Sequence, residues 1–278
     1  MPELPEVETI KRSLEPLILG QRIVASELLL AKALKLAGPD QLSAATSQAV
    51  ISELLRRGKH LIIRLDTGYD LIFHLRMTGK LLFEPQEAEL PKHTTAVFYF
   101  ASQTKLVFAD TRKFGTLHLV TSGDWERVSS LKGIGPEPLG ADFTFDYFYA
   151  GLQRRTKIKP LLLDQTFIAG LGNIYADESL FRAGIHPERP AASLSKAEAE
   201  RLYRAVRETI ADGVEHRGTT VSDYLDGLGK KGTFQNLLAV YRRTGEVCPR
   251  CGRTIERIVV GGRSSHLCPG CQVKSDCD

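Results

Sequence analysis

The chain has 278 residues, 42% of them hydrophobic and 25% charged, and carries a formal net charge of +4. This length fits two domains plus a small module, and no apolar run is long enough to cross a bilayer, so we expect a soluble protein rather than a membrane protein. Residues 217–278 hold ten Lys and Arg against six Asp and Glu, a surplus equal to that of the whole chain. Such a basic end indicates a polyanionic partner.

The chain begins with the sequence MPELPE, in which Pro2 is followed by Glu3. If Met1 is removed, Pro2 carries a free secondary amine with a pKa of ~8, against ~10.4 for a lysine side chain. A secondary amine condenses with an aldehyde-like carbon to give an iminium ion, and the neighbouring carboxylate can transfer a proton. The alternative is that the prolines have only a structural role, because proline is favoured in the first turn of a helix.

A helix is predicted over Glu6–Leu19, because apolar residues recur there at helical spacing until Gly20. The short strand-like runs that follow are separated by turn residues, which is typical of a β-sandwich or barrel. A helix over Pro39–Ala49 interrupts them. The predicted strands are Arg22–Leu30, Val50–Arg56, His60–Asp66, Leu71–Arg76, Lys80–Phe83, Ala96–Ala101, Lys105–Ala109 and Thr116–Val120.

The loop Gly133–Pro138 marks the predicted domain boundary, since the apolar period beyond it is that of helices. The stretch Gly218–Gly232 is polar and rich in glycine, and it is predicted to be a mobile loop. The predicted helices are Phe145–Arg154, Lys159–Asp164, Asn173–Ala183 and Lys196–Val214.

All the cysteines lie near the C-terminus, where two C-x2-C pairs enclose sixteen residues with a predicted hairpin, Thr254–Val260 and Ser264–Leu267. This is the spacing of a structural zinc ribbon, in which four thiolates complete the tetrahedron and leave no open position for catalysis. Two disulfides are the alternative, but no signal peptide is evident, which favours a reducing compartment. The expected ligands are Cys248, Cys251, Cys268 and Cys271, with Cys277 as a free thiol.

Six motifs occur together: PELPEVET from Pro2, RGK from Arg57, HLRMTG from His74, DTRKFG from Asp110, GNIYADESLF from Gly172, and the four cysteines with Gly262-Arg263 between them. In this combination the chain resembles the bacterial formamidopyrimidine-DNA glycosylase family over essentially its full length. The resemblance implies an α+β fold with an N-terminal β-sandwich and N-terminal helix (1–133), a helix–two-turn–helix DNA-binding domain (134–220), a lesion-capping loop and linker (221–247) and a C-terminal zinc finger (248–278).

The resemblance also implies a function in base excision repair. The enzyme would remove oxidised purines, such as 8-oxoguanine and formamidopyrimidines, from damaged double-stranded DNA and then cleave the abasic strand by β,δ-elimination. Pro2 would attack the sugar C1′ of an extruded nucleotide, and Glu3 would transfer the proton. Lys59 matches a lysine assigned to elimination and phosphate contact, and Arg263 matches an arginine that grips the phosphates beside the lesion.

Two acidic residues match supporting groups: Glu6, near the nucleophile, and Glu178, which in the family faces the N-terminal amine. Three residues match the group that fills the space left by the flipped nucleotide, namely Met77, Arg112 and Phe114. Further DNA contacts are expected from Asn173, at the start of a helix, and from His93, Arg154 and Lys159. The histidines His60 and His74 are expected to be structural, and one structural Zn²⁺ is the only expected cofactor.

Two other interpretations remain open. The endonuclease VIII branch of the same superfamily prefers oxidised pyrimidines, but Met77 with Arg112 and Phe114 favours the purine branch. A non-enzymatic zinc-ribbon DNA-binding protein would have no use for a free Pro2 amine beside Glu3, so the N-terminus separates it from an enzyme. In either case we expect a cytoplasmic, bacterial monomer, associated with the nucleoid while acting.

Overall fold

The computed structural model describes residues 1–221 and 223–274, so Cys277 lies outside the described residues. The chain forms two compact units. The first contains Met1–Gly133 and His216–Gln235, and the second contains Ile134–Glu215 and the chain from Asn236 onward. Within the described ranges, no helix is both long and apolar enough to cross a membrane.

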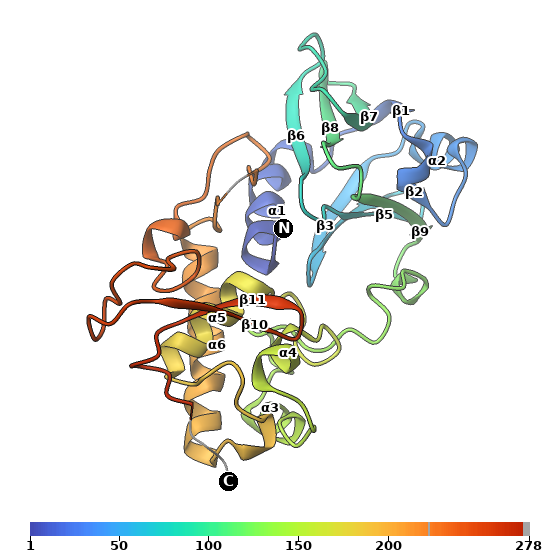
Figure 1. The fold of residues 1–278 in the computed structure, drawn as a ribbon. Helices are drawn as coiled ribbons and strands as arrows, with labels where there is room; N and C mark the ends of the chain where they lie inside the picture. The colour runs from blue at the N-terminus through green and yellow to red at the C-terminus, as the bar shows by residue number, and fades with distance from the viewer. Residues whose placement is uncertain (222, 275–278) are drawn as a thin grey trace. The chain divides into compact units, whose positions relative to one another are not determined.

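The first unit is built on two sheets, whose strands Figure 1 labels except for β4. One sheet has the order β1-β7-β8-β6 and the other the order β2-β9-β5-β4-β3, and every pairing is antiparallel except that of β2 with β9. The strands are Ile23–Leu28 (β1), Leu34–Lys35 (β2), Ile51–Arg57 (β3), His60–Leu65 (β4), Tyr69–His74 (β5), Gly79–Pro85 (β6), Thr94–Phe100 (β7), Thr104–Asp110 (β8) and Thr116–Thr121 (β9). The predicted β-sandwich is therefore present, and the short β2 is the strand that the sequence pattern did not indicate.

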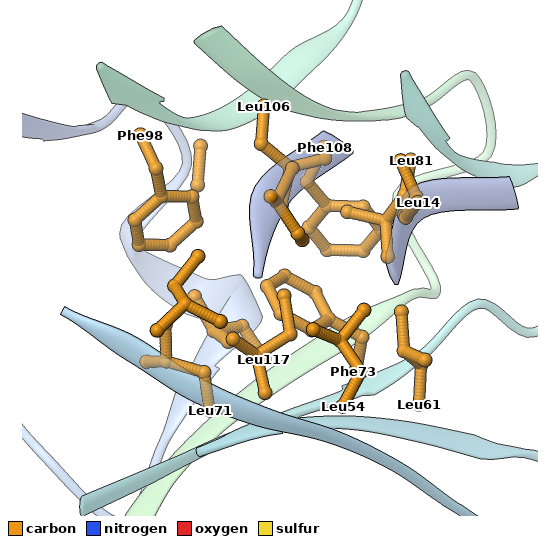
Figure 2. Packing of buried hydrophobic residues seen from close by; sticks show 14 of the residues in the cluster. Leu14, Leu54, Leu61, Leu71, Phe73, Leu81, Phe98, Leu106, Phe108 and Leu117 are labelled. Atoms are coloured by element: carbon orange, nitrogen blue, oxygen red, sulfur yellow. The ribbon is translucent and has the colours of Figure 1, made fainter. Parts of the chain in front are cut away.

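The core of this unit lies between the two sheets, where residues such as Leu71 and Phe73 of β5 and Leu106 and Phe108 of β8 pack into one hydrophobic cluster (Figure 2). The Phe73 ring of β5 meets Phe108 and Phe98 of the other sheet edge-on, with ring centroids 5.5 and 6.1 Å apart. Each such apolar side chain contributes about 1.5–3 kcal/mol when it leaves water. The sandwich is thus a rigid support for the turns at its edges.

Helix α1, Leu4–Ile18, packs into the same core through one apolar stripe. Val7, Ile10 and Leu14 are completely buried. The helix begins two residues before the predicted start, because Pro5 suits its first turn and Glu6 binds a backbone N–H there. The N-terminal end of the chain therefore leads directly into a helix that is buried along one face.

Residues 216–235 follow the helices of the second unit in sequence but belong to the first unit. The Phe83 N–H at the edge of β6 donates to the carbonyl of Gly227 over 2.9 Å, and the Gly227 N–H donates to Ser13 Oγ of α1 over 2.9 Å. A side chain at Gly227 would meet Leu14, since its Cβ would lie 2.4 Å from Leu14 Cδ2. The described part of this predicted loop contains no regular helix or strand between 218 and 232, but its backbone is packed onto α1 and β6 rather than separate from them.

The second unit is helical, with an antiparallel hairpin of two strands (Figure 1). Helices α5 and α6 pack closely, because Gly213 leaves room for the Tyr175 ring. Its elements are Phe145–Gly151 (α3), Ile158–Leu163 (α4), Asn173–Ala183 (α5), Lys196–Glu215 (α6), Glu256–Val260 (β10) and Arg263–Leu267 (β11). The remaining helices of the chain are Pro39–Thr46 (α2) and the short 3-10 turns Ala31–Ala33, Trp125–Arg127, Ala191–Ser193 and Phe234–Leu237.

Candidate active site

The N-terminal turn is organised by the carboxylate of Glu6. Its Oε2 accepts the N–H of Glu3 over 2.7 Å, and its Oε1 accepts the N–H of Thr219 over 2.7 Å. Pro2, Glu3 and Glu6 are all buried. Gly218 has a φ of +77°, and a Cβ there would lie 2.9 Å from Glu6 Oε1. Glu6 therefore fixes the backbone beside Pro2 and joins it to the returning stretch 216–235.

Lys59 lies in the tight turn between β3 and β4, after Gly58 with its φ of +55°. An ion pair ties this region to α1, since Arg56 Nε donates to Glu8 Oε2 over 2.7 Å. Burial raises the pKa of Glu8, but the guanidinium groups of Arg56 and Arg12 together outweigh that effect and hold the pKa below its usual range. The turn that carries Lys59 is thus anchored to α1, the helix that begins two residues after Pro2.

The three predicted wedge residues are exposed at the edge of the sandwich, on two neighbouring turns. Met77 is 37% exposed and Phe114 55% exposed, which is unusual for large apolar side chains. The Arg112 guanidinium lies 5.2 Å from the centre of the Phe114 ring, and its Nη1 is 3.4 Å from Met77 Sδ. His93 is half-buried just before β7, with a φ of +68°. The structure therefore brings Met77, Arg112 and Phe114 together.

In the second unit, Arg263 follows the glycine turn of the hairpin and is exposed. Within the described residues its side chain has no hydrogen bond or ion pair, so the guanidinium is available to a ligand. The carbonyl of the next residue, Ser264, accepts Asn173 Nδ2 over 3.0 Å and Lys159 Nζ over 2.6 Å. Asn173 thus holds the hairpin against the start of α5.

Two predicted site residues, Lys159 and Glu178, are buried in the second unit. Lys159 was predicted to contact DNA, but its side chain is completely buried and its ammonium group pairs with Asp177, which prevents direct contact. Glu178 was predicted to face the N-terminal amine, which belongs to the other unit. Within the second unit its carboxylate accepts the backbone N–H groups of residues 239–241 over 2.8–3.0 Å. Burial raises the pKa of Glu178, although these three donors oppose the shift.

Arg154 is exposed near the surface of the helical unit. Its Nη1 pairs with Asp164 Oδ2 over 3.0 Å, and its guanidinium lies 5.4 Å from the centre of the Phe167 ring. An exposed ion pair of this kind contributes little to stability and exchanges readily for another anion. The position of Arg154 is compatible with the predicted phosphate contact.

The four cysteines of the finger converge on one point. Their sulfur atoms all lie within 4.8 Å of one another, with Cys251 and Cys268 3.3 Å apart and Cys248 and Cys271 3.9 Å apart. Four Zn–S bonds of about 2.3 Å place tetrahedral sulfurs about 3.8 Å apart, so the residues fit a single zinc ion. With four protein ligands the ion is structural, and it would hold the base of the hairpin that carries Arg263.

Three histidines form a buried cluster on the outer face of the second sheet. His60 and His74 are cross-strand partners with ring centroids 4.2 Å apart, and His118 lies on the adjacent strand. Burial lowers the pKa of His60 to about 3 and that of His74 to about 2, and the neighbouring positive charges act in the same direction. These rings are neutral at physiological pH.

Sequence reasoning missed two buried aspartates. Asp110 accepts hydrogen bonds from both turns of the wedge, and Asp177 pairs with Lys159 and with His266. Asp110 carried a signal, because an aspartate before a tight turn commonly accepts the N–H groups that follow it. Asp177 carried none, since it lies inside a helix and its partners are distant in sequence.

Three family models match the chain: the formamidopyrimidine-DNA glycosylase N-terminal domain over 1–117, the corresponding H2TH domain over 134–224, and a zinc finger found in FPG and IleRS over 245–273. The formamidopyrimidine-DNA glycosylase of Heliobacterium modesticaldum is 50% identical over 277 residues, covering 98% of this chain and 100% of the relative. That of Pelotomaculum thermopropionicum is 47% identical over 273 residues, covering 98% and 99%.

Solved structures agree with this result. The complex between the Lactococcus lactis Fpg and an abasic site containing DNA superimposes with a TM-score of 0.91 at 42% identity, covering 98% of this chain and 100% of the other. The L. lactis mutant in complex with a Fapy-dG containing DNA gives a TM-score of 0.92 at 41% identity with the same coverage. The chain therefore belongs to the formamidopyrimidine-DNA glycosylase family.

Proposed function

We propose that this enzyme removes oxidised purines, including formamidopyrimidines and 8-oxoguanine, from double-stranded DNA and then cleaves the abasic strand. Family membership supports the base-excision step, and the L. lactis relative has been solved with both Fapy-dG and abasic-site DNA. An exposed apolar wedge beside an arginine supports action on duplex DNA, because a base must leave the stack before its sugar is accessible.

The nucleophile in this proposal is the Pro2 nitrogen, after removal of Met1, because an amide nitrogen cannot attack. Its lone pair forms a bond to the sugar C1′ as the bond from C1′ to the base breaks, and the proton that the amine loses passes to the departing base. The bond from C1′ to the ring oxygen then breaks, Glu3 transfers a proton to that oxygen, and the opened sugar remains bound to Pro2 as an iminium ion that withdraws electrons from it. Loss of the C2′ proton then expels the 3′ phosphate, and a second elimination expels the 5′ phosphate. The observation that carries this assignment is the Glu6–Glu3 hydrogen bond, which fixes the backbone beside Pro2.

Other residues bind the DNA in this proposal. Lys59 and Arg263 contact phosphates, and Arg154 and His93 extend the contact. Glu6 supports the N-terminal turn, and Met77, Arg112 and Phe114 occupy the space of the extruded nucleotide. The sandwich (1–133) carries the chemistry, the helical domain (134–220) and the finger (248–278) grip the duplex, and the stretch 221–247 covers the lesion. The chain acts as a monomer in the bacterial cytoplasm, on the nucleoid.

The deciding experiment is borohydride trapping on a duplex that contains 8-oxoguanine, after the mass of the purified N-terminus has shown whether Met1 is absent. The adduct should map to Pro2 by peptide mass. Pro2→Gly keeps a primary amine and should retain some strand cleavage while losing most base excision, and Glu3→Gln should bind the duplex but barely excise. Pro5→Ala, in the same turn, should behave like the parent. An adduct on Lys59 would refute the assignment.

A parallel assay on a duplex with an oxidised pyrimidine tests the endonuclease VIII-like alternative. The relatives at 47–50% identity are named formamidopyrimidine-DNA glycosylases, which favours the purine preference. Faster excision of the pyrimidine lesion than of 8-oxoguanine would contradict the proposed purine preference. Acetylating the N-terminal amine tests the non-enzymatic alternative, because a protein that only binds DNA should keep its DNA affinity.

A further inference from the structure

Asp110, the last residue of β8, is a buried carboxylate with an unusual set of donors. Its Oδ2 accepts the N–H of Gly115 over 2.6 Å, and its Oδ1 accepts the N–H of Arg112 over 3.1 Å and the hydroxyl of Thr78. Its own N–H donates to the carbonyl of His93 over 3.0 Å. In the part of the chain that the structure describes, no cation pairs with it, although it is only 1% exposed. The carboxylate is therefore held entirely by neutral donors.

The hydrogen-bond partners of Asp110 belong to three separate segments. Thr78 follows Met77 in the turn before β6, Arg112 and Gly115 enclose Phe114 in the turn after β8, and His93 precedes β7. Asp110 thus connects the two turns that carry Met77, Arg112 and Phe114 with the segment that carries His93. Thr78 is the specific link between the two wedge turns, because its hydroxyl donates to Asp110 and accepts the N–H of Arg112 over 3.1 Å.

Both turns are tight, so these hydrogen bonds determine where the side chains project. Lys113 has a φ of +58°, and a Cβ at Gly115 would lie 3.1 Å from Asp110 Oδ2 and 2.7 Å from Phe108 Cζ. A Cβ at Gly79 would lie 2.4 Å from the carbonyl oxygen of Leu75. The exposed contacts among the wedge side chains are weak by comparison, since a long sulfur contact and a solvent-exposed cation–π pair give little stability. Hydrogen bonds to a buried carboxylate are stronger.

We infer that Asp110, through Thr78, is the positioning residue that fixes Arg112 relative to Met77 and Phe114, and thereby determines how well the enzyme distinguishes the base opposite the lesion. The inference rests on the proposed function, because it assigns the wedge turns to the extruded nucleotide and its partner. Asp110 itself touches no DNA. It acts only by keeping the two turns in one arrangement.

The test uses Thr78→Val, which keeps the shape of the side chain and removes the hydroxyl. Single-turnover excision of 8-oxoguanine is measured opposite cytosine and opposite adenine. The ratio of the two rates should change about tenfold, the size expected for losing a hydrogen bond to a charged acceptor. Cleavage of a pre-formed abasic site should fall by less, and Thr78→Ser should restore the parent ratio. Asp110→Asn should change the ratio in the same way, because its amide places a donor opposite backbone donors.

Thr95→Val is the matched control. Thr95 lies on β7, is buried, and among the described residues its hydroxyl has no hydrogen-bond partner, so this variant should keep the parent ratio. Thermal unfolding of each variant separates misplacement of the turns from loss of the fold. If Arg112→Ala changes the ratio and Thr78→Val does not, the positioning role is refuted while the proposed function stands. If the parent protein excises no base from any duplex, the proposed function itself fails.

Discussion

Lys159 and Asp177 form an ion pair in which both side chains are completely buried, with Nζ 2.6 Å from Oδ1. The pair lies under the finger hairpin, because the same ammonium group donates to the Ser264 carbonyl and the other Asp177 oxygen accepts the N–H and Nδ1 of His266 over 2.9 Å. Strand β11 is therefore fixed to α4 and α5 one residue from Arg263. This places Lys159 behind the hairpin as a support.

Replacing Lys159 should destabilise the second unit. Lys159→Met leaves the Asp177 carboxylate buried without its cation, and breaking a buried pair in this way costs about 3–5 kcal/mol. Lys157→Met is the matched control, because Lys157 is 50% exposed in its pair with Glu188 and such a surface pair contributes at most about 1 kcal/mol. Denaturant unfolding measures both. Equal stability of the two variants, with DNA affinity lost only in Lys159→Met, would favour a direct DNA contact.

Removing the zinc should release the finger while the sandwich stays folded. A four-thiolate site contributes folding free energy directly, so Cys251→Ser should lose the metal and abolish DNA binding. Arg263→Ala should retain the metal and bind more weakly, and Cys277→Ser, outside the four-cysteine site, should match the parent. Metal content and fluorescence anisotropy with a duplex that carries an abasic-site analogue check these outcomes. Equal affinity of the apo and zinc-loaded proteins would contradict the structural role.

The wedge side chains should have separable roles. Phe114→Ala removes a wedge that need not recognise a base, and since extrusion costs a few kcal/mol, excision should slow about tenfold with every opposite base. Arg112→Ala should also change the discrimination between cytosine and adenine. Tyr69→Ala, an exposed aromatic residue on β5, is the control. The measurement is single-turnover excision on duplexes that differ only at the base opposite the lesion. If both wedge variants excise at the parent rate on every duplex, Arg112 and Phe114 have no role in extrusion.

The buried histidines should make the first unit sensitive to acid. Their pKa values in the folded chain, about 3 for His60 and about 2 for His74, lie below the ordinary value of ~6.5, so the unfolded chain binds protons that the folded chain does not. Stability is therefore full above pH ~6.5 and falls as the pH drops below it, by up to about 1.4 kcal/mol per pH unit for each ring.

His74→Phe keeps an aromatic ring and removes one titrating group, so it should reduce that slope. The half-exposed His216, changed to Phe, is the control. The measurement is the free energy of unfolding between pH 4 and 7, and an unchanged slope in His74→Phe would mean that its ring is protonated in the folded protein.

The sandwich and the finger could be predicted because their signals are local. A short apolar run between turns, such as Leu61–Ile63, identifies a strand, and the spacing of the cysteines identifies a tetrahedral site. The proposed nucleophile was recognisable because Pro2 and Glu3 are neighbours. The wedge residues were recognisable as a motif, and the position of Phe114 at the end of a predicted strand, beside Gly115, indicated an exposed turn.

What could not be predicted depends on contacts between distant residues. Lys159 reads as a surface lysine because Asp177 and Ser264 are far from it in sequence, and only their convergence shows that the ammonium group is buried. Glu178 likewise reads as a site carboxylate until residues 239–241 supply its donors. The glycines of 218–232 indicate a loop, but not that Ser13 and Phe83 hold it.

The hydrogen bond between Glu6 and Thr219 also bears on how the protein is made. The first unit is completed by a stretch that the ribosome synthesises only after helices α3 to α6. A nascent chain that has exposed only its sandwich therefore lacks the Thr219 N–H that the Glu6 carboxylate accepts, and it leaves the edge of β6 without Gly227. The first unit is thus completed only after most of the chain has been translated, and products that terminate before residue 216 lack the segment that packs against the N-terminal turn.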